Sequence, residues 1–430
     1  MDSKKNHIVV LVHILGFFFA FGYAAFYWTG MHAWAFYAHR MTMAFGGALI
    51  VWWLRLHCLQ TPENRAFLYA ILIWAFMFRL ILVAFVPATQ ADVYRYVWDG
   101  KMQVCGINPY LYSPDSEELA VFRDHVIYPR INHPHLRTIY PPVAQFFFRI
   151  AYQIGGGSVW GYKIMALITE LLTLLVMIAI LRIRNLPLVN ILLYAWFPVP
   201  ILEFFITGHV DCFGVLLFSV FAYHYIANKD CVAAVFLALA SNVKYYPLVI
   251  LPYLLIRWIR QDKWTPVLIF IGVFILCYLP FLDAGWSIFL SLGVYLREWE
   301  FNSPIYHLFQ NRNINYMMAI VWVVMIQMTV RSDIKCFLWM LLGFLLMMPA
   351  VYPWYLTWLL PFLIIFTSPI IYVMLTMMQV VYFSQVQLQY YGVWKLPPYM
   401  MVIEYIPVLV FGMVQVLRSY PLSKQKKLYS

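Results

Sequence analysis

The sequence predicts an all-α fold, a polytopic transmembrane helical bundle that crosses the bilayer about fourteen times. Of its 430 residues, 64% are hydrophobic and only 11% are charged, whereas a soluble domain carries about 25% charged residues. Apolar stretches of about twenty residues, the length that spans a bilayer core, recur along the chain. These stretches are continuous and do not alternate with polar residues, so they are typical of helices and not of a β-barrel.

Lysine and arginine in the short connections predict the orientation, because positively charged loops stay in the cytoplasm. The basic segments are expected to be cytoplasmic, and they place both termini inside: MDSKKN, 55–65, 182–184, 257–263, 331–335 and the tail SKQKK. The spans that satisfy this rule are 8–28, 40–57, 66–86, 159–181, 187–205, 211–228, 231–243, 246–257, 264–282, 316–330, 335–349, 352–367, 369–390 and 399–417.

The first run, 8–28, is longer than a signal-peptide core and is followed by no small-residue cleavage site, so we expect a retained helix. The net charge of +11 is explained by cytoplasmic loops and by contacts with anionic membrane lipids, and no nucleic-acid partner is expected. The six cysteines are scattered without CxxC spacing, which indicates buried, inert thiols and neither a zinc site nor a disulfide framework.

Two segments are predicted on the extracytoplasmic side, 87–157 and 283–315. A polar loop this long in a compact protein is usually functional. Within the first segment, 140–157 begins with a proline pair and is interpreted as an amphipathic helix on the membrane surface. The short pair 231–243 and 246–257 is interpreted as two half-helices, a form tolerated where the backbone lines a cavity.

The stretch ADVYRYVWDGK, directly after an apolar helix, concentrates ionisable residues at the membrane boundary, where such residues are costly unless they are used. Asp92 and Asp99 would lie about 10 Å apart along a helix, with Arg95 between them to hold either carboxylate ionised. Gly100 and Gly106 are expected to end this helix. The alternative is a solvated loop helix with one salt bridge. The residues that share one face are Asp92, Arg95, Tyr96, Asp99 and Gln103.

A second acidic motif, TGHVDCFG, falls between two apolar spans on the same side. His209 and Asp211 are candidates to bind substrate, but Asp211 is equally well interpreted as a cap on the next helix. Two potential ligands without a third make a metal site a weak hypothesis.

Two further motifs carry cations. Lys244, in SNVKYYPLVILP, needs an anion or water between apolar helices, and a lipid phosphate could supply that anion; snorkelling to the interface is the alternative. Arg297, in REWEFNSP, could grip a phosphate, with Asn302 close by, although pairing with the adjacent acids would also explain it. The aromatic run VYPWYLTWLLPFL is explained by interfacial anchoring, and sugar stacking would be an addition to that role.

In this order the motifs resemble those of multi-spanning glycosyltransferases of the GT-C superfamily. The chain is similar to the bacterial mannosyltransferase-like families and, more distantly, to the catalytic subunit of the first mannosyltransferase of the glycolipid-anchor pathway. The matching pieces are ADVYRYVWDGK, GINPY, TIYPPVAQ, GHVDCFG, SNVKYYPLVILP, REWEFNSP and YPWYLTWLLPFL. The resemblance implies a catalytic core at 66–367, two extra N-terminal helices within 1–65, and C-terminal helices with a basic cytoplasmic tail at 368–430.

The resemblance also implies an acidic residue early in the first large outer loop, a position that Asp92 occupies. Distant eukaryotic relatives carry a DxD there, but Tyr94 stands in place of the second acid, so no metal or other cofactor is expected, although a divalent ion is conceivable. The implied partners are a polyprenyl-phosphate-linked sugar, with mannose first, and a lipid, glycan or protein acceptor outside the cytoplasm. The implied transfer inverts the sugar carbon.

The chemistry needs a base for the acceptor hydroxyl and cations for the departing phosphate. We therefore predict Asp92 as the general base, with a substrate- and phosphate-binding set of Arg95, Asp99, Lys101, His209, Asp211, Lys244, Arg297 and Asn302. The alternatives are a transporter or glycolipid flippase, which would place charges within the spans, and a purely structural membrane protein.

Overall fold

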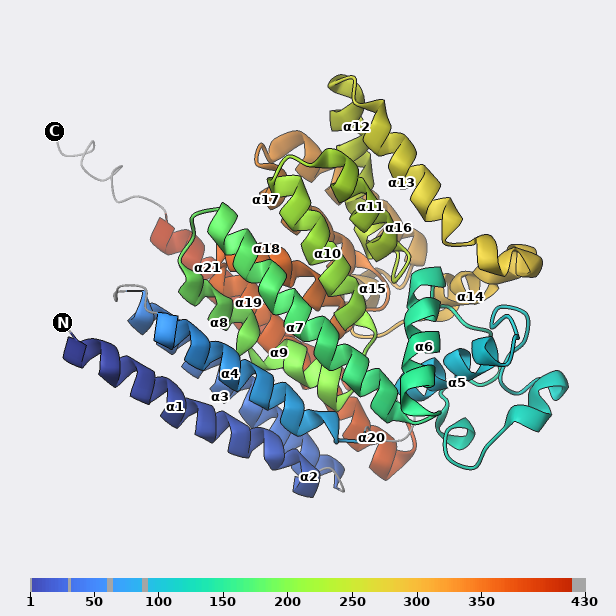
Figure 1. The fold of residues 1–430 in the computed structure, drawn as a ribbon, viewed down its shortest axis with the longest axis horizontal. Helices are drawn as coiled ribbons and strands as arrows, with labels where there is room; N and C mark the ends of the chain where they lie inside the picture. Colours follow the sequence, from blue (N-terminus) through green and yellow to red (C-terminus); the bar gives the residue numbers. More distant parts are fainter. Residues whose placement is uncertain (1, 30–31, 60–64, 87–91, 420–430) are drawn as a thin grey trace.

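The computed structural model describes residues 2–29, 32–59, 65–86 and 92–419, and in these residues it is built of helices (Figure 1). The one β-pairing among them is an isolated bridge between Phe301 and Ala350. The all-α fold predicted from the sequence is therefore confirmed. The predicted basic tail, 420–430, lies outside the described residues.

The α-helices are, in chain order, α1 Asp2–Ala24, α2 Phe26–Thr29, α3 Ala33–Cys58, α4 Arg65–Val83, α5 Asp92–Val104, α6 Pro142–Gly155, α7 Val159–Ile183, α8 Leu192–Ala195, α9 Pro198–Ile201, α10 Asp211–Ile226, α11 Asp230–Ser241, α12 Leu251–Arg260, α13 Trp264–Leu276, α14 Leu290–Glu298, α15 Pro304–Phe309, α16 Arg312–Thr329, α17 Asp333–Met347, α18 Leu360–Phe366, α19 Pro369–Met377, α20 Phe383–Tyr391 and α21 Pro398–Ser419. The 3-10 helices are η1 Glu117–Phe122, η2 Tyr128–Arg130, η3 Leu188–Ile191, η5 Tyr246–Ile250, η6 Leu279–Phe289, η7 Pro353–Leu359 and η8 Met378–Tyr382. The segment η4, Leu202–Ile206, is a π-helix.

Several of these helices can cross a membrane, as the sequence predicted. Seven described helices are long and apolar enough, or eight if one bent pair counts as a single span. Four more apolar helices, α10, α11, α13 and the segment 353–366, are shorter. The predicted number of fourteen is therefore not confirmed, because many predicted spans are broken into short helices by proline or glycine.

One predicted outer loop is more helical than expected. Most of 283–315 is taken up by the end of η6, by α14 and by α15, and the stretch Leu279–Glu298 is itself long and apolar enough to span a membrane. Gly285, with φ of +51°, interrupts the helix there, a backbone conformation that glycine adopts without steric cost. The predicted helix boundary at 282 is wrong at this point.

The predicted span 187–205 is a bent pair, η3–α8 followed by α9–η4, with an angle of 43° between its halves. Pro198 causes the break, because a proline pushes the residue before it out of the helical region; Phe197 has ψ of 124°. After the bend the chain widens into the π-helix η4, a form often found at functional sites. The pair predicted as half-helices is likewise interrupted, at 242–245, between α11 and η5.

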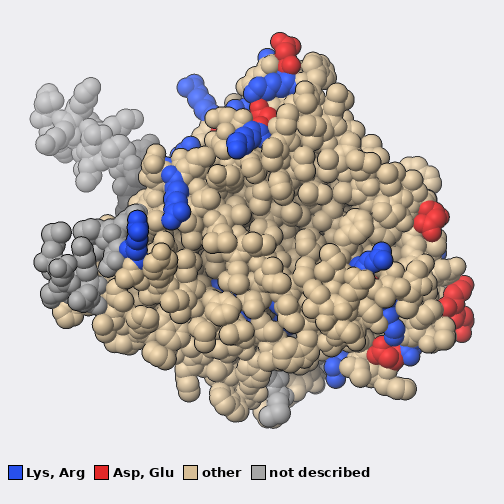
Figure 2. Space-filling model, in the orientation of Figure 1, with Lys and Arg blue, Asp and Glu red and all other residues tan. Residues whose placement is uncertain are grey.

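The long helices α1, α4 and α7 run side by side across the molecule (Figure 1). The N-terminal end of α1 and the C-terminal end of α21 lie at the left of this view, whereas the segment that carries η1 and η2 lies at the right. In Figure 2, lysine and arginine gather at the left and top edges of this face, and the right edge carries mixed charges. The broad middle is almost uncharged, as expected of a surface that meets lipid.

Helices α5 and α6 pack closely against each other at the right-hand end. Gly100 makes this possible, because a Cβ at that position would lie 2.3 Å from the carbonyl oxygen of Phe148. Gly100 therefore lies inside α5 and does not end it, contrary to the sequence interpretation. Gly106, with φ of +77°, follows the helix end. The proline pair does begin α6, with Pro142 as its first residue.

Candidate active site

The first turn of α5 carries Asp92, the predicted base, and the following loop surrounds its carboxylate with donors. Asn132 Nδ2 donates a hydrogen bond to Oδ1 at 2.6 Å, and the Tyr140 hydroxyl donates to Oδ2 at 3.2 Å. The side chain of Asp92 remains 24% exposed. Burial raises the pKa of this carboxyl, but the neighbouring His209, the Asn132 amide and the charge of Lys244 outweigh burial and lower it to about 2. Asp92 is therefore an accessible, ionised carboxylate.

The TGHVD motif brings His209 beside Asp92. Gly208 turns the chain with φ of +77°, and a Cβ there would lie 3.2 Å from that of Val93 on α5. His209 Nδ1 lies 3.6 Å from Asp92 Oδ2 and Nε2 lies 3.6 Å from Glu203 Oε2. Its ring stacks on Trp354 with 3.6 Å between centroids. The imidazole is thus held between two carboxylates.

Glu203, in the π-helix η4, was not selected from the sequence. It is fully buried and forms an ion pair with Arg40 Nη2 of α3 at 2.7 Å. Gln379 Nε2 and the Tyr382 hydroxyl, both in η8, donate to it at 2.9 and 2.6 Å. The sequence signal that could have singled out Glu203 is an acidic residue inside an apolar run. Its contacts with α3 and η8 could not have been predicted, because these elements are distant in sequence. The chain Asp92, His209, Glu203 and Arg40 therefore links α5 to α3 through η4.

The second acidic motif and the lysine motif meet directly. Lys244 Nζ lies 2.7 Å from Asp211 Oδ2, and the indole nitrogen of Trp358 donates to Asp211 Oδ1 at 2.7 Å. The ammonium also lies 5.0 and 5.8 Å from the ring centroids of Tyr355 and Tyr246, within the range of cation–π attraction. Asp211 is fully buried, but Lys244 keeps 13% of its side chain exposed. The ammonium is therefore not fully enclosed by its protein partners.

Arg95 and Asp99 form a buried pair that organises the loop. Arg95 Nε lies 2.8 Å from Asp99 Oδ1, and Arg95 Nη1 donates to the Leu136 carbonyl at 2.8 Å. Gln145 of α6 donates to the other oxygen of Asp99 at 3.1 Å. Because both groups are occupied, the geometry favours a supporting role over the predicted contact with substrate.

The sequence of this chain matches a known protein family. Residues 21–260 match the family described as alpha-(1->6)-mannopyranosyltransferase, N-terminal domain. This chain belongs to that family. No curated protein and no solved structure matches it. The match covers Asp92, His209, Asp211 and Lys244, and it begins before α3, so it also takes in Arg40.

Membership assigns the chain a mannosyltransferase role within a multi-pass membrane protein, as the motif resemblance indicated. The matched part of this mannosyltransferase contains every residue of the Asp92–His209–Glu203–Arg40 chain. Trp354 and Gln379, which complete the surroundings of His209 and Glu203, lie beyond residue 260. The boundary predicted at residue 66 for the catalytic core stays a prediction, because no observation tests it.

We call Asp92, His209, Glu203, Asp211 and Lys244 the Asp92 cluster. Three residues of the predicted substrate-binding set have no contact with this cluster among the described residues of this mannosyltransferase. Lys101 donates to the Phe122 carbonyl at 2.6 Å and pairs with Asp124 at 3.2 Å. Arg297 is exposed at the end of α14. Asn302 is buried, and its Nδ2 donates to Glu404 Oε1 of α21 at 3.0 Å. Their assignment to substrate binding stays a prediction, and their contacts give it no support.

Metal-binding donors are sparse at this site. In the part of the chain that the structure describes, no three His, Cys, Asp or Glu side chains are grouped to hold a metal ion. Tyr94, which replaces the second acid of the distant eukaryotic relatives, instead accepts a hydrogen bond from Arg130 at 3.5 Å. The expectation that the reaction uses no metal stays a prediction.

Proposed function

We propose that this mannosyltransferase moves mannose from a polyprenyl-phosphate donor to an acceptor hydroxyl on the extracytoplasmic side, with inversion and with Asp92 as the general base. The observation that carries the proposal is that two partly exposed, oppositely charged groups lie near enough for the charge of one to affect the other. The Asp92 carboxylate and the Lys244 ammonium are both partly exposed, and the lysine charge contributes to the low pKa of Asp92. The family name supports an α-(1→6) linkage.

The step balances as a single displacement. The acceptor oxygen forms a bond to the anomeric carbon while the bond from that carbon to the phosphate oxygen breaks, and the electron pair leaves with the phosphate. The acceptor proton passes to Asp92. A carboxylate with a pKa of about 2 is a weak base, but it suffices because the hydroxyl becomes strongly acidic as its oxygen bonds to an electron-poor carbon.

Lys244 supplies the positive charge that the departing phosphate needs. Electrostatic groups already aimed at a developing charge contribute strongly, because they need no reorganisation during the reaction. Asp211 and the rings of Tyr246 and Tyr355 hold the ammonium in place. A phosphate bound next to this ammonium would share the lysine with Asp211.

Glu203 and His209 act as positioning residues in this proposal. Arg40 and Gln379 fix the Glu203 carboxylate, which in turn faces one nitrogen of His209, while the other nitrogen faces Asp92. Stacking on Trp354 removes the remaining freedom of the ring. Through these contacts, the buried helices orient the group next to the base.

The test is transfer by the purified protein in lipid nanodiscs, supplied with mannosyl-phospho-polyprenol and a mannoside acceptor. Release of polyprenyl phosphate and formation of the mannosylated product are both measured. Asp92→Asn should lower the rate by about a thousandfold or more, since it removes the base and keeps the size. Asp115→Asn, the same change at an exposed position of the same loop, is the matched control and should be fully active.

Two results would overturn the proposal. Undiminished transfer by Asp92→Asn would remove this residue from the mechanism. Transfer from a nucleotide-linked mannose, with no reaction of the lipid-linked donor, would reject the donor class.

A further inference from the structure

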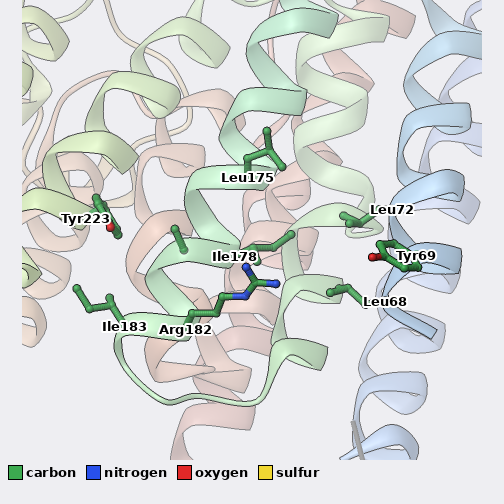
Figure 3. Close-up of a pocket in the computed structure, with 9 residues that line it drawn as sticks. Leu68, Tyr69, Leu72, Leu175, Ile178, Arg182, Ile183 and Tyr223 are labelled. Atoms are coloured by element: carbon green, nitrogen blue, oxygen red, sulfur yellow. The ribbon is translucent and has the colours of Figure 1, made fainter. Parts of the chain in front are cut away.

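A groove lies at the opposite end of the molecule from Asp92, between α4, α7 and α10. Its volume is about 600 Å³, within the range of small-molecule sites. Apart from two tyrosine hydroxyls and one arginine, its lining is wholly apolar (Figure 3). The residues that line it are Leu68, Tyr69, Leu72, Leu175, Ile178, Ala179, Arg182, Ile183 and Tyr223.

The arginine is the feature that calls for a ligand. Arg182 lies in the last turn of α7, and in Figure 3 its guanidinium reaches into the groove towards Ile178 and Leu68. Among the residues that the structure describes, none forms a hydrogen bond or an ion pair with this guanidinium group. Arg182 is exposed, so its charge is open to an anion at the end of a helix that is long and apolar enough to span a membrane.

The position of the groove limits what can fill it. Both α4 and α7 are long and apolar enough to cross a membrane, so a groove between them opens to lipid chains. Arg182 belongs to the basic segments that the charge rule places in the cytoplasm. Arg65, one turn before Tyr69 on the same face of α4, adds a second cation near this end. No Asp or Glu lines the groove within the described residues.

We propose that this groove binds an anionic phospholipid of the cytoplasmic leaflet, with an acyl chain against the leucines and the phosphate on Arg182. Apolar walls match the chain, and a planar guanidinium matches the phosphate in two-point geometry. Anionic lipids are concentrated in the cytoplasmic leaflet, where basic side chains attract them. The site is separate from the proposed transfer site, because none of its lining residues belongs to the Asp92 cluster.

The test measures thermal unfolding of the full-length protein in detergent as phosphatidylglycerol or phosphatidylcholine is added. The wild type should be stabilised at lower concentrations of phosphatidylglycerol. Arg182→Gln should weaken this preference by about fivefold, the worth of one arginine near an anionic surface. The matched control is Arg184→Gln. Arg184 follows the last residue of α7 and is exposed like Arg182, but it does not line the groove, so this variant should keep the preference.

A second variant tests the chain instead of the charge. Ala179→Phe fills the groove and leaves Arg182 in place, so it should abolish the selective stabilisation. Equal losses in Arg182→Gln and Arg184→Gln would mean general surface attraction and would overturn the proposal, as would an unchanged response in Ala179→Phe. Stabilisation by glycerol phosphate alone would also overturn it, because that probe has no acyl chain. None of these readouts depends on sugar transfer.

Discussion

The protein buries charge in two regions, and the two regions treat it differently. Within the spans, Arg79 and Glu170 are both fully buried, 3.0 Å apart. Arg79 also donates to the carbonyls of Ala75 and Ala195, at 3.0 and 2.9 Å, and the Tyr194 hydroxyl donates to Glu170. The guanidinium of Arg79 and the carboxylate of Glu170 are therefore both hydrogen-bonded to groups of the protein and are closed to solvent.

The Asp92 region is left open by comparison. Asp92 and Lys244 both keep part of their surface exposed, and the nitrogens of His209 lie at 3.6 Å from their two carboxylates, beyond ordinary hydrogen-bond length. A closed pair serves the fold, whereas an open cluster keeps charge available for a substrate. A transporter would be expected to leave charge open within the spans, and the Arg79–Glu170 pair does not do so.

The strongest test of this comparison removes one partner of the closed pair. Arg79→Met leaves Glu170 buried without its cation, and we expect a loss of about 3 to 5 kcal/mol in the free energy of unfolding. Measurement by thermal or denaturant unfolding in detergent is suitable. Transfer per folded molecule should be unchanged. The double variant Arg79→Met with Glu170→Leu should recover most of the stability, and a failure to do so would show that the pair has another role.

The open cluster should lose activity as well as stability. Lys244→Gln is expected to lower kcat per folded molecule by about a hundredfold, since it removes the charge that meets the leaving phosphate. It also leaves the buried Asp211 without its cation, so the unfolding temperature should fall. Lys263→Gln is the matched control, because Lys263 also pairs with an aspartate, Asp230, at 2.6 Å but is 46% exposed. If both variants retained full activity, the phosphate-binding role of Lys244 would be rejected.

A smaller effect is expected from the hydroxyl that donates to the base. Tyr140→Phe removes the 3.2 Å hydrogen bond to Asp92 and should reduce kcat by about fivefold to tenfold, the worth of one ordinary hydrogen bond. Tyr112→Phe, at an exposed tyrosine of the same loop, should have no effect. A kcat for Tyr140→Phe equal to that of the wild type would show that the contact does not orient the carboxylate.

The smallest effect concerns acidity. Because the pKa of Asp92 is lowered to about 2, its contribution to stability is complete above its unfolded pKa, near 4, and is lost only as the pH falls through about 2. Protonation of Asp92 should therefore not reduce kcat/KM at any pH above about 4. Asn132→Ala removes a donor to the carboxylate and should move the acid limb to higher pH. An acid limb at the same pH in both proteins would contradict this.

Much of the fold was predictable because it depends on composition. The apolar runs identified the membrane helices, and the helix at 92–104 followed from its own pattern of residues. The number of spans was not predictable, since proline and glycine, as at Pro198 and Gly285, divide apolar runs in ways that hydropathy alone does not register.

The candidate site was predictable only where chemistry stands out locally. Asp92, His209, Asp211 and Lys244 each attracted notice as polar residues between apolar segments, and the structure brings them together. Asn132 and Tyr140 look like ordinary loop residues, and three of the partners of Glu203 come from positions 163 to 179 residues away. Arg297 is the opposite case. Its motif is conspicuous in the sequence, but the arginine lies at the surface.

The environment of Glu203 has a consequence for biogenesis. Its cation comes from α3, near the start of the chain, and two of its donors come from η8, near the other end. During membrane insertion this carboxylate meets Arg40 early but must wait for the last quarter of the polypeptide before its ligation is complete. If synthesis stopped before residue 379, residues 21–260 would already have been made, but Glu203 would lack its two donors from η8.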